Sequence, residues 1–544
     1  MKIIYNQKEI ECSVGKKVID IFEDEIKNSK NNIIACNINN QIRDLNEELE
    51  DGDKVELVDL TKKDGRLVYQ RGVMYIMSKA FNELYPDICL TVNYQLGDAM
   101  YCVSDNTEIT EEIINNVHKK MDEIIKNKLE IRKVTMTKEV ARDFYKKEKT
   151  SKGILQLTKK NKISLYFCEE YYNYFYGVMP INTEFIKIYD IMLYAKGFLV
   201  RYPSKKNING LDEFVERKKL LSTLDEYENI HRLLQIETIE KLNKHIKDGS
   251  IKDVILLAEA LHEKKMAEIA NHVKEHPKLK MVLIAGPSSS GKTTFAKRLG
   301  IQLRLNGLKP VTISMDNYFV EREDNPKDEN GEYDFECIEA IDTKLLNKDL
   351  TALLNGETIK VPTFNFKSGK KEYNGETMSL KDDEILVIEG IHCLNDKLTF
   401  HIPNEQKFKI YVSDLTVLNI DYYNRISTTD TRLIRRIVRD YKFRGNGALR
   451  TLETWKMVNR GEEKNIYPFQ EEADIMFNSS LIYELSVLKK YAKPLLEGIK
   501  EEEPEYSEAK RIIDLLQYFD EFDDELIPDN SILREFIGNS IFDY

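Results

Sequence analysis

A run of small residues near the middle of the 544-residue chain has the spacing of a phosphate-binding loop. Gly286, Gly291, Lys292 and Thr293 fit the pattern G-x-x-x-x-G-K-[S/T], with an apolar segment before them and helical spacing after them. Those flanks disfavour a chance match in a Gly/Ser turn. Glycines let backbone N–H groups face phosphate oxygens, lysine brings a positive charge, and threonine offers a hydroxyl to Mg²⁺. We therefore predict a nucleotide-phosphate site formed by Gly286, Ser288, Ser289, Ser290, Gly291, Lys292, Thr293 and Thr294.

Carboxylates follow two further apolar segments that have the pattern of strands. Asp316 comes just after residues 311–314, and Glu389 directly follows residues 385–388. Parallel strands end at the same edge of a sheet, where ligands bind, so both carboxylates are expected beside the loop. Phosphoryl transfer needs a metal near the phosphates and a carboxylate near the attacking hydroxyl. Thr293, Asp316 and Glu389 are therefore the predicted metal-site residues, with N-cap or turn roles as the alternative for each acid.

Arginines recur on one predicted helix farther along the chain. Arg432, Arg435 and Arg439 share a helix face, and Arg436 lies next to it. An exposed helix paired with acids such as Asp440 is the alternative to a phosphate-facing lid.

Residues 280 to about 490 resemble the uridine kinase/phosphoribulokinase family of P-loop kinases. The resemblance is carried by "GPSSSGKTT" at the loop, "SMDNYF" at 314–319, "YDFECIEAID" at 333–342, "VPTFNFKSGKK" at 361–371, "VIEGIH" at 387–392 and "DTRLIRRIVRDYKFRG" at 430–445. It implies a kinase that uses ATP and Mg²⁺, with a parallel sheet flanked by helices.

The same resemblance implies roles for single residues. Asp316 would be the base for a sugar 5′-hydroxyl, and Glu389 a second metal contact. Tyr318 would line the acceptor pocket, and Glu336 stands where the family holds ribose with an aspartate. We expect three arginines to act beside Lys292, namely Arg436, Arg439 and Arg444. They would neutralise the negative charge of the transferred phosphoryl group and of the nucleotide phosphates.

The base-reading segment departs from uridine kinases. In those enzymes a tyrosine and a histidine bind the pyrimidine, whereas this chain has Phe364 and Gly369 there, with Phe366 between them. Loss of polar contacts should weaken discrimination for uracil or cytosine. The expected acceptor is therefore a nucleoside-like small molecule of open base specificity.

The N-terminal half resembles two modules of threonyl-tRNA synthetases. Residues 1–60, ending in "LEDGDKVELV", resemble the β-grasp TGS domain, and residues 67–225 resemble the α+β editing domain. At the editing positions this chain has Arg71 and Tyr75, then Phe175 and Met179, so neither zinc binding nor that hydrolysis is expected. We expect a fold kept for structure, regulation, or docking of RNA or protein.

The remaining segments and the composition complete the expected multidomain α/β architecture. Residues 226–276 form a predicted helical connector, with a helix starting at residue 251, and residues 277–490 form the kinase domain. Residues 491–544 are expected to be a helical tail with a helix over 531–538, and its alternatives are a packing role or a clasp on the N-terminal domains. The net charge of −12 argues against a general nucleic-acid binder. Seven scattered cysteines without C-x-x-C pairs, no apolar signal core and no long apolar run favour a cytoplasmic protein without a membrane anchor.

Three functions remain open at this stage. The leading one is the nucleoside-like kinase, and the second is a nucleotide-gated RNA- or ribosome-associated regulator with little turnover, which would bind through residues 1–225. A GTP switch is disfavoured because the nearest guanine-reading string, Asn347-Lys348-Asp349, lacks the N-K-x-D spacing. The acceptor, ATP or GTP preference, oligomeric state and role of the N-terminal modules stay undetermined.

Overall fold

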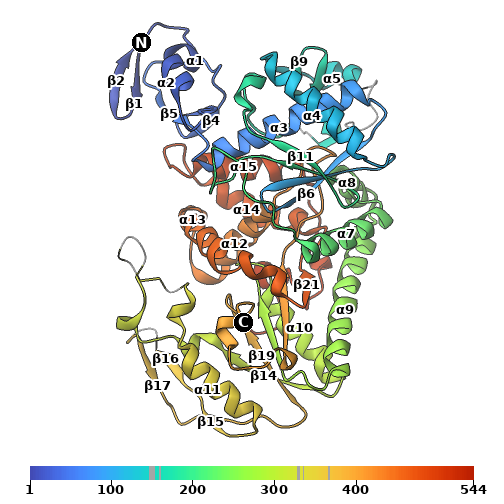
Figure 1. Ribbon diagram of the computed structural model, residues 1–544, viewed down its shortest axis with the longest axis vertical. Coiled ribbons are helices and arrows are strands. Elements are labelled where there is room, and N and C mark those ends of the chain that lie inside the picture. The colour runs from blue at the N-terminus through green and yellow to red at the C-terminus, as the bar shows by residue number, and fades with distance from the viewer. Residues whose placement is uncertain (146–153, 158–160, 328–330, 332, 335, 366–367) are drawn as a thin grey trace.

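Five parallel strands form the sheet that carries the phosphate loop. The computed structural model describes residues 1–145, 154–157, 161–327, 331, 333–334, 336–365 and 368–544 (Figure 1). The strands run in the order β14-β19-β13-β20-β21, and every neighbouring pair is parallel. Their bounds are β13 Met281–Ala285, β14 Lys309–Ser314, β19 Glu384–Glu389, β20 Lys407–Ser413 and β21 Ile475–Asn478. All five residues of β13 are buried, as expected for a central strand with helices on both faces.

The strand register brings the predicted acids to one edge. β19 lies between β13 and β14, with Glu389 opposite both Ile284 and Ser314. The predicted strands at 311–314 and 385–388 are confirmed, each slightly longer than expected. Strand order thus places the carboxyl end of β19 beside the loop that follows β13.

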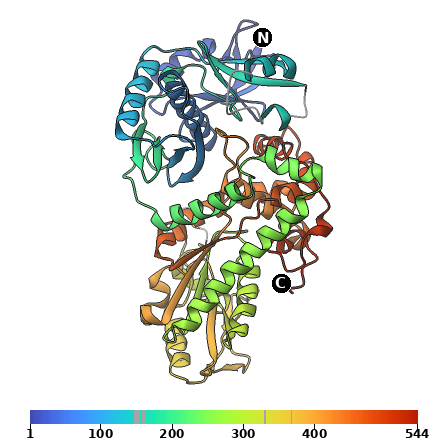
Figure 2. The ribbon, with the colours of Figure 1, turned by 90° about the vertical axis from the view of Figure 1, so that its right-hand side faces the viewer.

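Helices cover both faces of this sheet (Figures 1 and 2). The long helix α9 crosses in front of the sheet in Figure 2, and its Glu259 and Glu263 bind Arg298 of α10 at 3.1 and 2.7 Å. The helix expected from residue 251 is confirmed. The helices of this half and its connector are α7 Lys218–Leu233, α8 Ile239–Asp248, α9 Ile251–Glu275, α10 Lys292–Leu305, α11 Thr343–Leu354, α12 Thr428–Arg444, α13 Ala448–Asn465 and α14 Glu484–Glu497. Since α7 begins at Lys218, the helical connector starts inside the span predicted for the second domain.

Short strands and turns follow β14 along the chain. The hairpins pair β15 (Ile359–Lys360) with β18 (Thr377–Met378), and β16 (Thr363–Asn365) with β17 (Lys370–Glu372). The 3₁₀ turns of this half are η2 Met315–Tyr318, η3 Arg322–Asp324, η4 Ile338–Ala340, η5 Asp396–Thr399, η6 Asn404–Gln406 and η7 Tyr467–Glu472. Phe366 lies outside the described residues.

The first 60 residues form a separate mixed sheet with two short helices, at the upper left of Figure 1. Its order is β2-β1-β5-β3-β4, and the predicted hairpin and central helical segment are present. The elements are β1 Lys2–Tyr5, β2 Lys8–Glu11, α1 Val18–Ile21, α2 Glu23–Asn28, β3 Ala35–Ile38, β4 Gln41–Arg43 and β5 Lys54–Val58. The TGS-like identity of this unit stays a prediction.

The second unit packs two antiparallel sheets around the buried helix α3 (Lys63–Leu84). The positions compared with an editing site do meet in space: the Tyr75 and Phe175 rings lie 5.5 Å apart, and Arg71 Nε donates to the Val178 carbonyl at 2.8 Å. The other elements are β6 Leu90–Leu96, β7 Ala99–Ser104, α4 Glu111–Lys126, β8 Arg132–Thr137, α5 Lys138–Tyr145, α6 Ile154–Leu157, β9 Lys162–Cys168, β10 Tyr171–Asn173, η1 Thr183–Phe185, β11 Asp190–Tyr194 and β12 Gly197–Arg201.

The C-terminal tail connects the two halves of the molecule. Its helix α15 (Tyr506–Leu516) contacts the N-terminal units: Glu508 pairs with Lys63 at 2.8 Å, and Lys510 binds Gln41 at 2.9 Å. The chain then continues through η8 (Asp524–Leu526) to α16 (Arg534–Ile537), beside the phosphate loop. The helix expected over residues 531–538 is thus only one turn long, and Gly538, with φ +86°, ends it. The described residues include no helix long and apolar enough to span a bilayer.

Arg511 of α15 makes the strongest link between the tail and the kinase region. Its Nη1 and Nη2 donate to the two carboxylate oxygens of Asp430, each at 2.7 Å, in the first turn of α12. We expect Arg511→Met to destabilise the protein by about 3–5 kcal/mol, because it leaves the largely buried Asp430 unpaired. Lys510→Met, which removes only a bond to an amide, should cost under about 1 kcal/mol. Equal shifts of the urea midpoint by circular dichroism for both variants would contradict this.

Candidate active site

Close backbone contacts shape the phosphate loop. A Cβ at Gly286 would lie 1.9 Å from the Val412 carbonyl oxygen of the neighbouring strand. Gly291 has φ +80° and precedes the first residue of α10. These two positions therefore require glycine, one for space and one for backbone conformation. The loop consequently holds its N–H groups at the N-terminus of α10, where anions bind.

Lys292, Thr293 and Glu389 meet at the floor of the loop. Lys292 Nζ donates to the carbonyls of Gly286 and Pro287 at 2.9 and 3.0 Å. Thr293 Oγ1 donates to Glu389 Oε1 at 3.0 Å. Burial raises the pKa of Glu389, while Lys292 and the Thr293 hydroxyl act in the opposite direction. A hydroxyl and a carboxylate are oxygen donors that suit Mg²⁺ held jointly with phosphates, so these residues fit that ion.

Asp316 lies on the same sheet edge, one turn beyond β14. Its side chain is exposed, and its surroundings raise its pKa by desolvation. The charge of Asp316 also raises the pKa of Glu389, so the two carboxylates interact electrostatically. Asp316 does not line the main cavity described below. The structure thus puts Asp316 on the same sheet edge as Glu389 and outside the described lining of that cavity.

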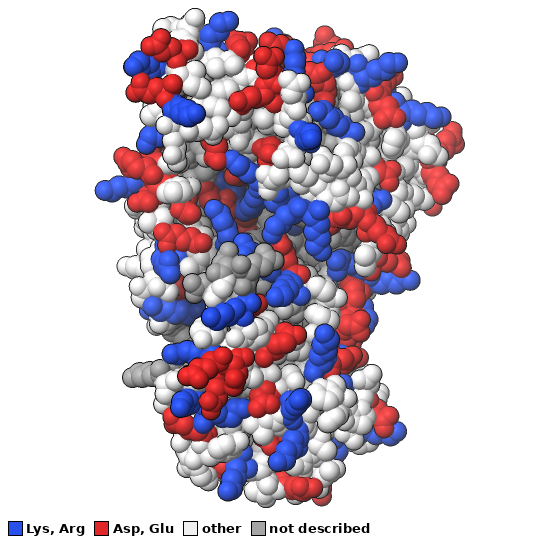
Figure 3. All heavy atoms as spheres, turned by 60° about the vertical axis from the view of Figure 1, so that its left-hand side comes forward, with Lys and Arg blue, Asp and Glu red and all other residues white. Residues whose placement is uncertain are grey.

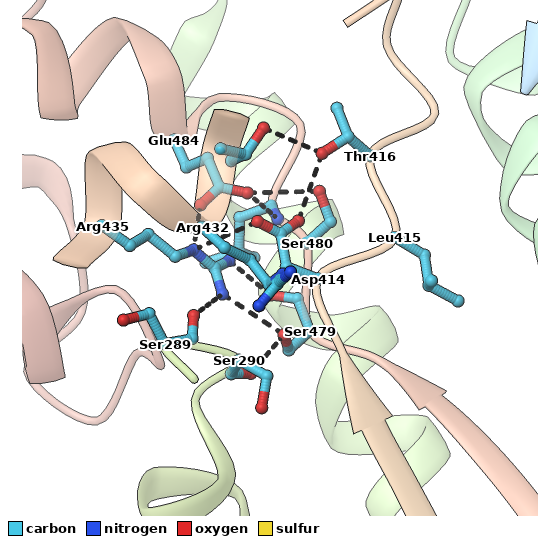
Figure 4. A network of polar contacts seen from close by, with 12 residues as sticks. Ser289, Ser290, Asp414, Leu415, Thr416, Arg432, Arg435, Ser479, Ser480 and Glu484 are labelled. Atoms are coloured by element: carbon cyan, nitrogen blue, oxygen red, sulfur yellow. Dashed lines mark hydrogen bonds and ion pairs between the residues drawn. The ribbon is translucent and has the colours of Figure 1, made fainter. Parts of the chain in front are cut away.

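Two arginines of α12 bind the phosphate loop from within the core (Figure 4). Arg432 makes two bonds to Glu462 of α13, at 2.7 and 2.9 Å, and donates to the Ser288 carbonyl at 3.1 Å. Arg435 donates to Glu484 at 2.5 Å and to the Ser289 carbonyl at 3.4 Å, and Figure 4 shows its guanidinium between Glu484 and the loop. Both guanidinium groups are buried and paired, so they position the loop rather than face a ligand.

The three arginines predicted to face phosphates do line a cavity. Arg436 Nη1 donates to the Ser288 hydroxyl at 2.7 Å. Arg436, Arg439 and Arg444 each also approach Asp440, at 3.3, 2.8 and 3.7 Å. The acid pairing raised as the alternative is therefore present, yet the three side chains still border the cavity. Asp440 holds them as a group above the loop.

The cavity has a volume of about 1020 Å³ and is electrically balanced. On the face in Figure 3, Lys and Arg gather around a hollow at mid-height. Among the residues that the structure describes, the cavity wall carries five cations and five carboxylates, namely Lys292, Arg436, Arg439, Arg444 and Arg534 against Glu336, Glu389, Glu462, Glu535 and Asp543. A triphosphate would therefore have to displace or neutralise some of these acids.

The acceptor-side predictions have mixed outcomes. Glu336 borders the cavity, and burial raises its pKa. Tyr318 differs from the expectation: it is 1% exposed and donates to Asp349 at 3.1 Å, because its ring fills the core under η2. Phe364 is buried on β16, with its ring 5.6 Å from Phe319. Tyr318 therefore packs in the core and is not among the described residues that border the cavity.

The C-terminal residues form an unpredicted wall of the cavity. Glu535 accepts hydrogen bonds from the backbone N–H of Thr294 at 3.2 Å and from its hydroxyl at 2.6 Å. Tyr544 OH lies 2.8 Å from the same hydroxyl, and Ile532 packs so closely that a Cβ at Gly291 would meet it at 2.4 Å. Glu462 similarly accepts from the Ser288 N–H at 2.7 Å. No local pattern marks these acids, since they reach the loop from more than 150 residues away.

Comparisons with known proteins agree with this geometry. Residues 281–485 match the family described as Phosphoribulokinase / Uridine kinase. The uridine kinases of Staphylococcus aureus strains JH9 and Newman are each 29% identical over 194 residues, covering 36% of this chain and 84% of theirs. These findings support a P-loop kinase domain in the C-terminal half.

A search of solved structures also returned matches to part of this chain. A "possible uridine kinase" from Bacillus stearothermophilus is 20% identical, with a TM-score of 0.24, over 37% of this chain and 89% of that one. A fructose transport system kinase described from Silicibacter sp. TM1040 is 15% identical, with a TM-score of 0.27, over 39% and 98%.

Glu535 occupies N–H and hydroxyl donors that a bound phosphate would use. We expect Glu535→Gln to tighten ATP binding about three- to tenfold, because a neutral amide competes less well with phosphate for these donors. Isothermal titration with a non-hydrolysable ATP analogue measures this. Glu525→Gln, an exposed acid of the same tail, should leave the affinity unchanged. Weaker binding by the Glu535 variant would show that this carboxylate supports the nucleotide instead.

Proposed function

We propose that this protein is an ATP- and Mg²⁺-dependent kinase that transfers a γ-phosphate to a hydroxyl of a nucleoside-like small molecule. The observation that carries the proposal is the meeting of Lys292, Thr293 and Glu389, with 3.0 Å between the threonine hydroxyl and the carboxylate. These groups come from two neighbouring parallel strands, at the edge where such sheets bind ligands. The family match over residues 281–485 supports the same assignment.

Each charged group then has a distinct task. Thr293 and Glu389 would hold Mg²⁺, which supplies charge neutralisation at the phosphates when bound. Lys292 lies within the loop and can exchange its carbonyl partners for phosphate oxygens. Asp316, next along the edge, would accept the proton of the acceptor hydroxyl. Its raised pKa keeps it closer to the range where a base works near neutral pH.

The arginines of α12 complete the phosphate environment. Arg436, Arg439 and Arg444 border the cavity as a group, so they can share the negative charge of the transferred phosphoryl group. A bound phosphate would compete with Asp440 for them, since all three approach that carboxylate. Closing of the lid would then depend on occupancy of the site.

The acceptor pocket favours a sugar-like part over a particular base. Glu336 borders the cavity and can accept from vicinal hydroxyls. Phe364 offers only an apolar ring, and Gly369, with φ +72°, offers no side chain. With no polar side chain at these two positions, a base would contribute there by contact area, which discriminates weakly among bases. The acceptor class is therefore a nucleoside or a related hydroxyl compound.

Asp316→Asn tests the proposed base. We expect acceptor-stimulated ADP release to fall about 10²- to 10⁴-fold with little change in ATP affinity, because only proton removal is lost. A panel of nucleosides and sugars, assayed by coupled ADP detection, identifies the acceptor first. Asp324→Asn, an exposed acid in the adjoining turn, is the matched control. An unchanged stimulated rate in the Asp316 variant, or no stimulating compound, rejects the kinase mechanism.

Lys292→Met tests the phosphate contact separately. We expect at least a 10²-fold loss of turnover, because the lysine charge at the phosphates is removed while the side-chain length is kept. Lys297→Met, one turn further along α10, is the control for helix stability. Comparable losses in both variants, with unfolding seen by circular dichroism, would mean that the effect is structural.

A nucleotide-gated regulator is the second candidate. It is favoured by the tail, which contacts both the N-terminal units and the phosphate loop. Ultraviolet crosslinking of the full chain to cellular RNA, followed by peptide mapping, tests it: crosslinks within residues 1–225 that change with nucleotide would support regulation. A GTP switch gains no support, because Asn347 is buried and its amide binds Thr343 and Leu398 carbonyls.

A further inference from the structure

A second cavity lies where the two N-terminal units meet the C-terminal tail. Its volume is about 380 Å³, within the range of pockets that hold small ligands. Its wall combines β4, α3, β9, the loop at 174–178 and α15. It is therefore separate from the phosphate-loop cavity, and the two share none of their described lining residues.

This junction cavity is strongly cationic in an acidic protein. Among the described residues, its wall carries six basic side chains and two acidic ones, although the chain has a net charge of −12. Within the described part of the chain, four of the six basic side chains have no carboxylate partner within 4 Å, namely Arg71, Lys133, Lys162 and Lys510. Basic groups that are gathered without matching acids attract an anion.

Arg71 is the clearest example of a basic side chain in this cavity that lacks a carboxylate partner among the described residues. Its Nε donates to the Val178 carbonyl, and its guanidinium lies against Gly177, where φ is +110° and an added Cβ would come within 2.8 Å. The side chain is half-buried, and burial lowers its pKa to about 10, although the neighbouring Tyr166 and Asp64 act in the opposite direction. A desolvated guanidinium without a carboxylate is costly, and a bound anion would remove that cost.

Aromatic rings form the opposite part of the wall. Tyr166 donates its hydroxyl to the Gly177 carbonyl at 2.7 Å, and the hydroxyls of Tyr174 and Tyr518 lie 2.5 Å apart. Tyr176 donates to the Arg511 carbonyl. Since the hydroxyls are already bonded within the protein, the rings are fixed and offer mainly their faces and edges. Fixed rings beside basic groups suit a planar base that carries a phosphate.

We propose that the junction cavity binds a nucleoside monophosphate, with the phosphate toward Arg71 and Lys162 and the base toward the tyrosines. A volume of 380 Å³ exceeds what a lone phosphate needs and is small for a triphosphate with its ion. This assignment needs no catalytic role for the N-terminal units, which agrees with their lack of metal-binding or hydrolytic side chains at the compared positions.

Arg511 would carry the effect of binding to the kinase region. It lines the junction cavity and also holds Asp430 at the start of α12, whose Arg432 and Arg436 bind Ser288 of the phosphate loop. An anion in the cavity competes with Asp430 for Arg511, which loosens the N-terminal end of α12. This second step rests on the proposed kinase function, whereas the binding step does not.

Photolabelling of the full chain with 8-azido-AMP, followed by peptide mapping, tests the site. We expect label within residues 162–178 or 507–518, and at least a tenfold loss of that label in Arg71→Gln and in Lys162→Gln. The Lys162 side chain makes no hydrogen bond or ion pair with the described residues, so this variant should fold normally. Arg132→Gln, an exposed neighbour on β8, is the matched control and should label like the wild type.

The outcomes separate the two proposals. Lys292→Met should remove label from the phosphate-loop cavity and leave the junction label intact, even if the kinase proposal is wrong. Label confined to residues 281–485, or junction label unchanged in both cavity variants, overturns the nucleotide site. Displacement of the label by a short RNA at lower concentration than AMP would assign the cavity to an RNA end and overturn the free-nucleotide proposal.

Discussion

Buried ion pairs hold the phosphate loop to the helices that cover it. Arg432 joins the Ser288 carbonyl to Glu462 of α13, and Arg435 joins the Ser289 carbonyl to Glu484 of α14. Because these guanidinium groups have no water to replace a lost partner, each pair must form completely. The loop, α12, α13 and α14 therefore keep one arrangement, and the cavity between them keeps its shape.

The arginines of α12 fall into two groups that differ in how deeply their side chains are buried. The buried pair fixes the loop, while Arg436, Arg439 and Arg444 reach the cavity and share Asp440. A phosphate can replace Asp440 for the second group without disturbing the first. Structural support and ligand binding thus come from adjacent turns of one helix, and the difference between them is solvent access.

The C-terminal tail contacts both halves of the molecule. Arg511 joins α15 to the start of α12, and twenty-four residues later Glu535 binds the first turn of α10. One segment therefore touches the N-terminal units, the lid helix and the phosphate loop. The tail is one route by which a change at the junction of the N-terminal units can reach the phosphate loop, since the two cavities share none of their described lining residues.

Local patterns predicted much of the kinase half. The glycine spacing at 286 and 291, the strands before Asp316 and Glu389 and the arginine period on α12 depend on neighbours in sequence, and the described structure contains each of them. Tyr318 was misplaced because its motif fixes its position after a strand but not the direction in which its ring packs. The short helix at 534–537 was overestimated because an apolar period does not show where packing ends a helix.

The sequence by itself determined the chemistry available at the loop: backbone donors, one lysine, one hydroxyl and two acids at strand ends. Only the tertiary structure decided which distant groups share that space. Glu462 and Glu535 bind loop N–H groups, and Arg71, Lys162 and Lys510 meet around one cavity, although hundreds of residues separate some of them. The spacing of residues within a segment indicates which helix or strand that segment forms. Contacts between residues far apart in sequence depend on how whole domains pack, and local spacing does not predict that packing.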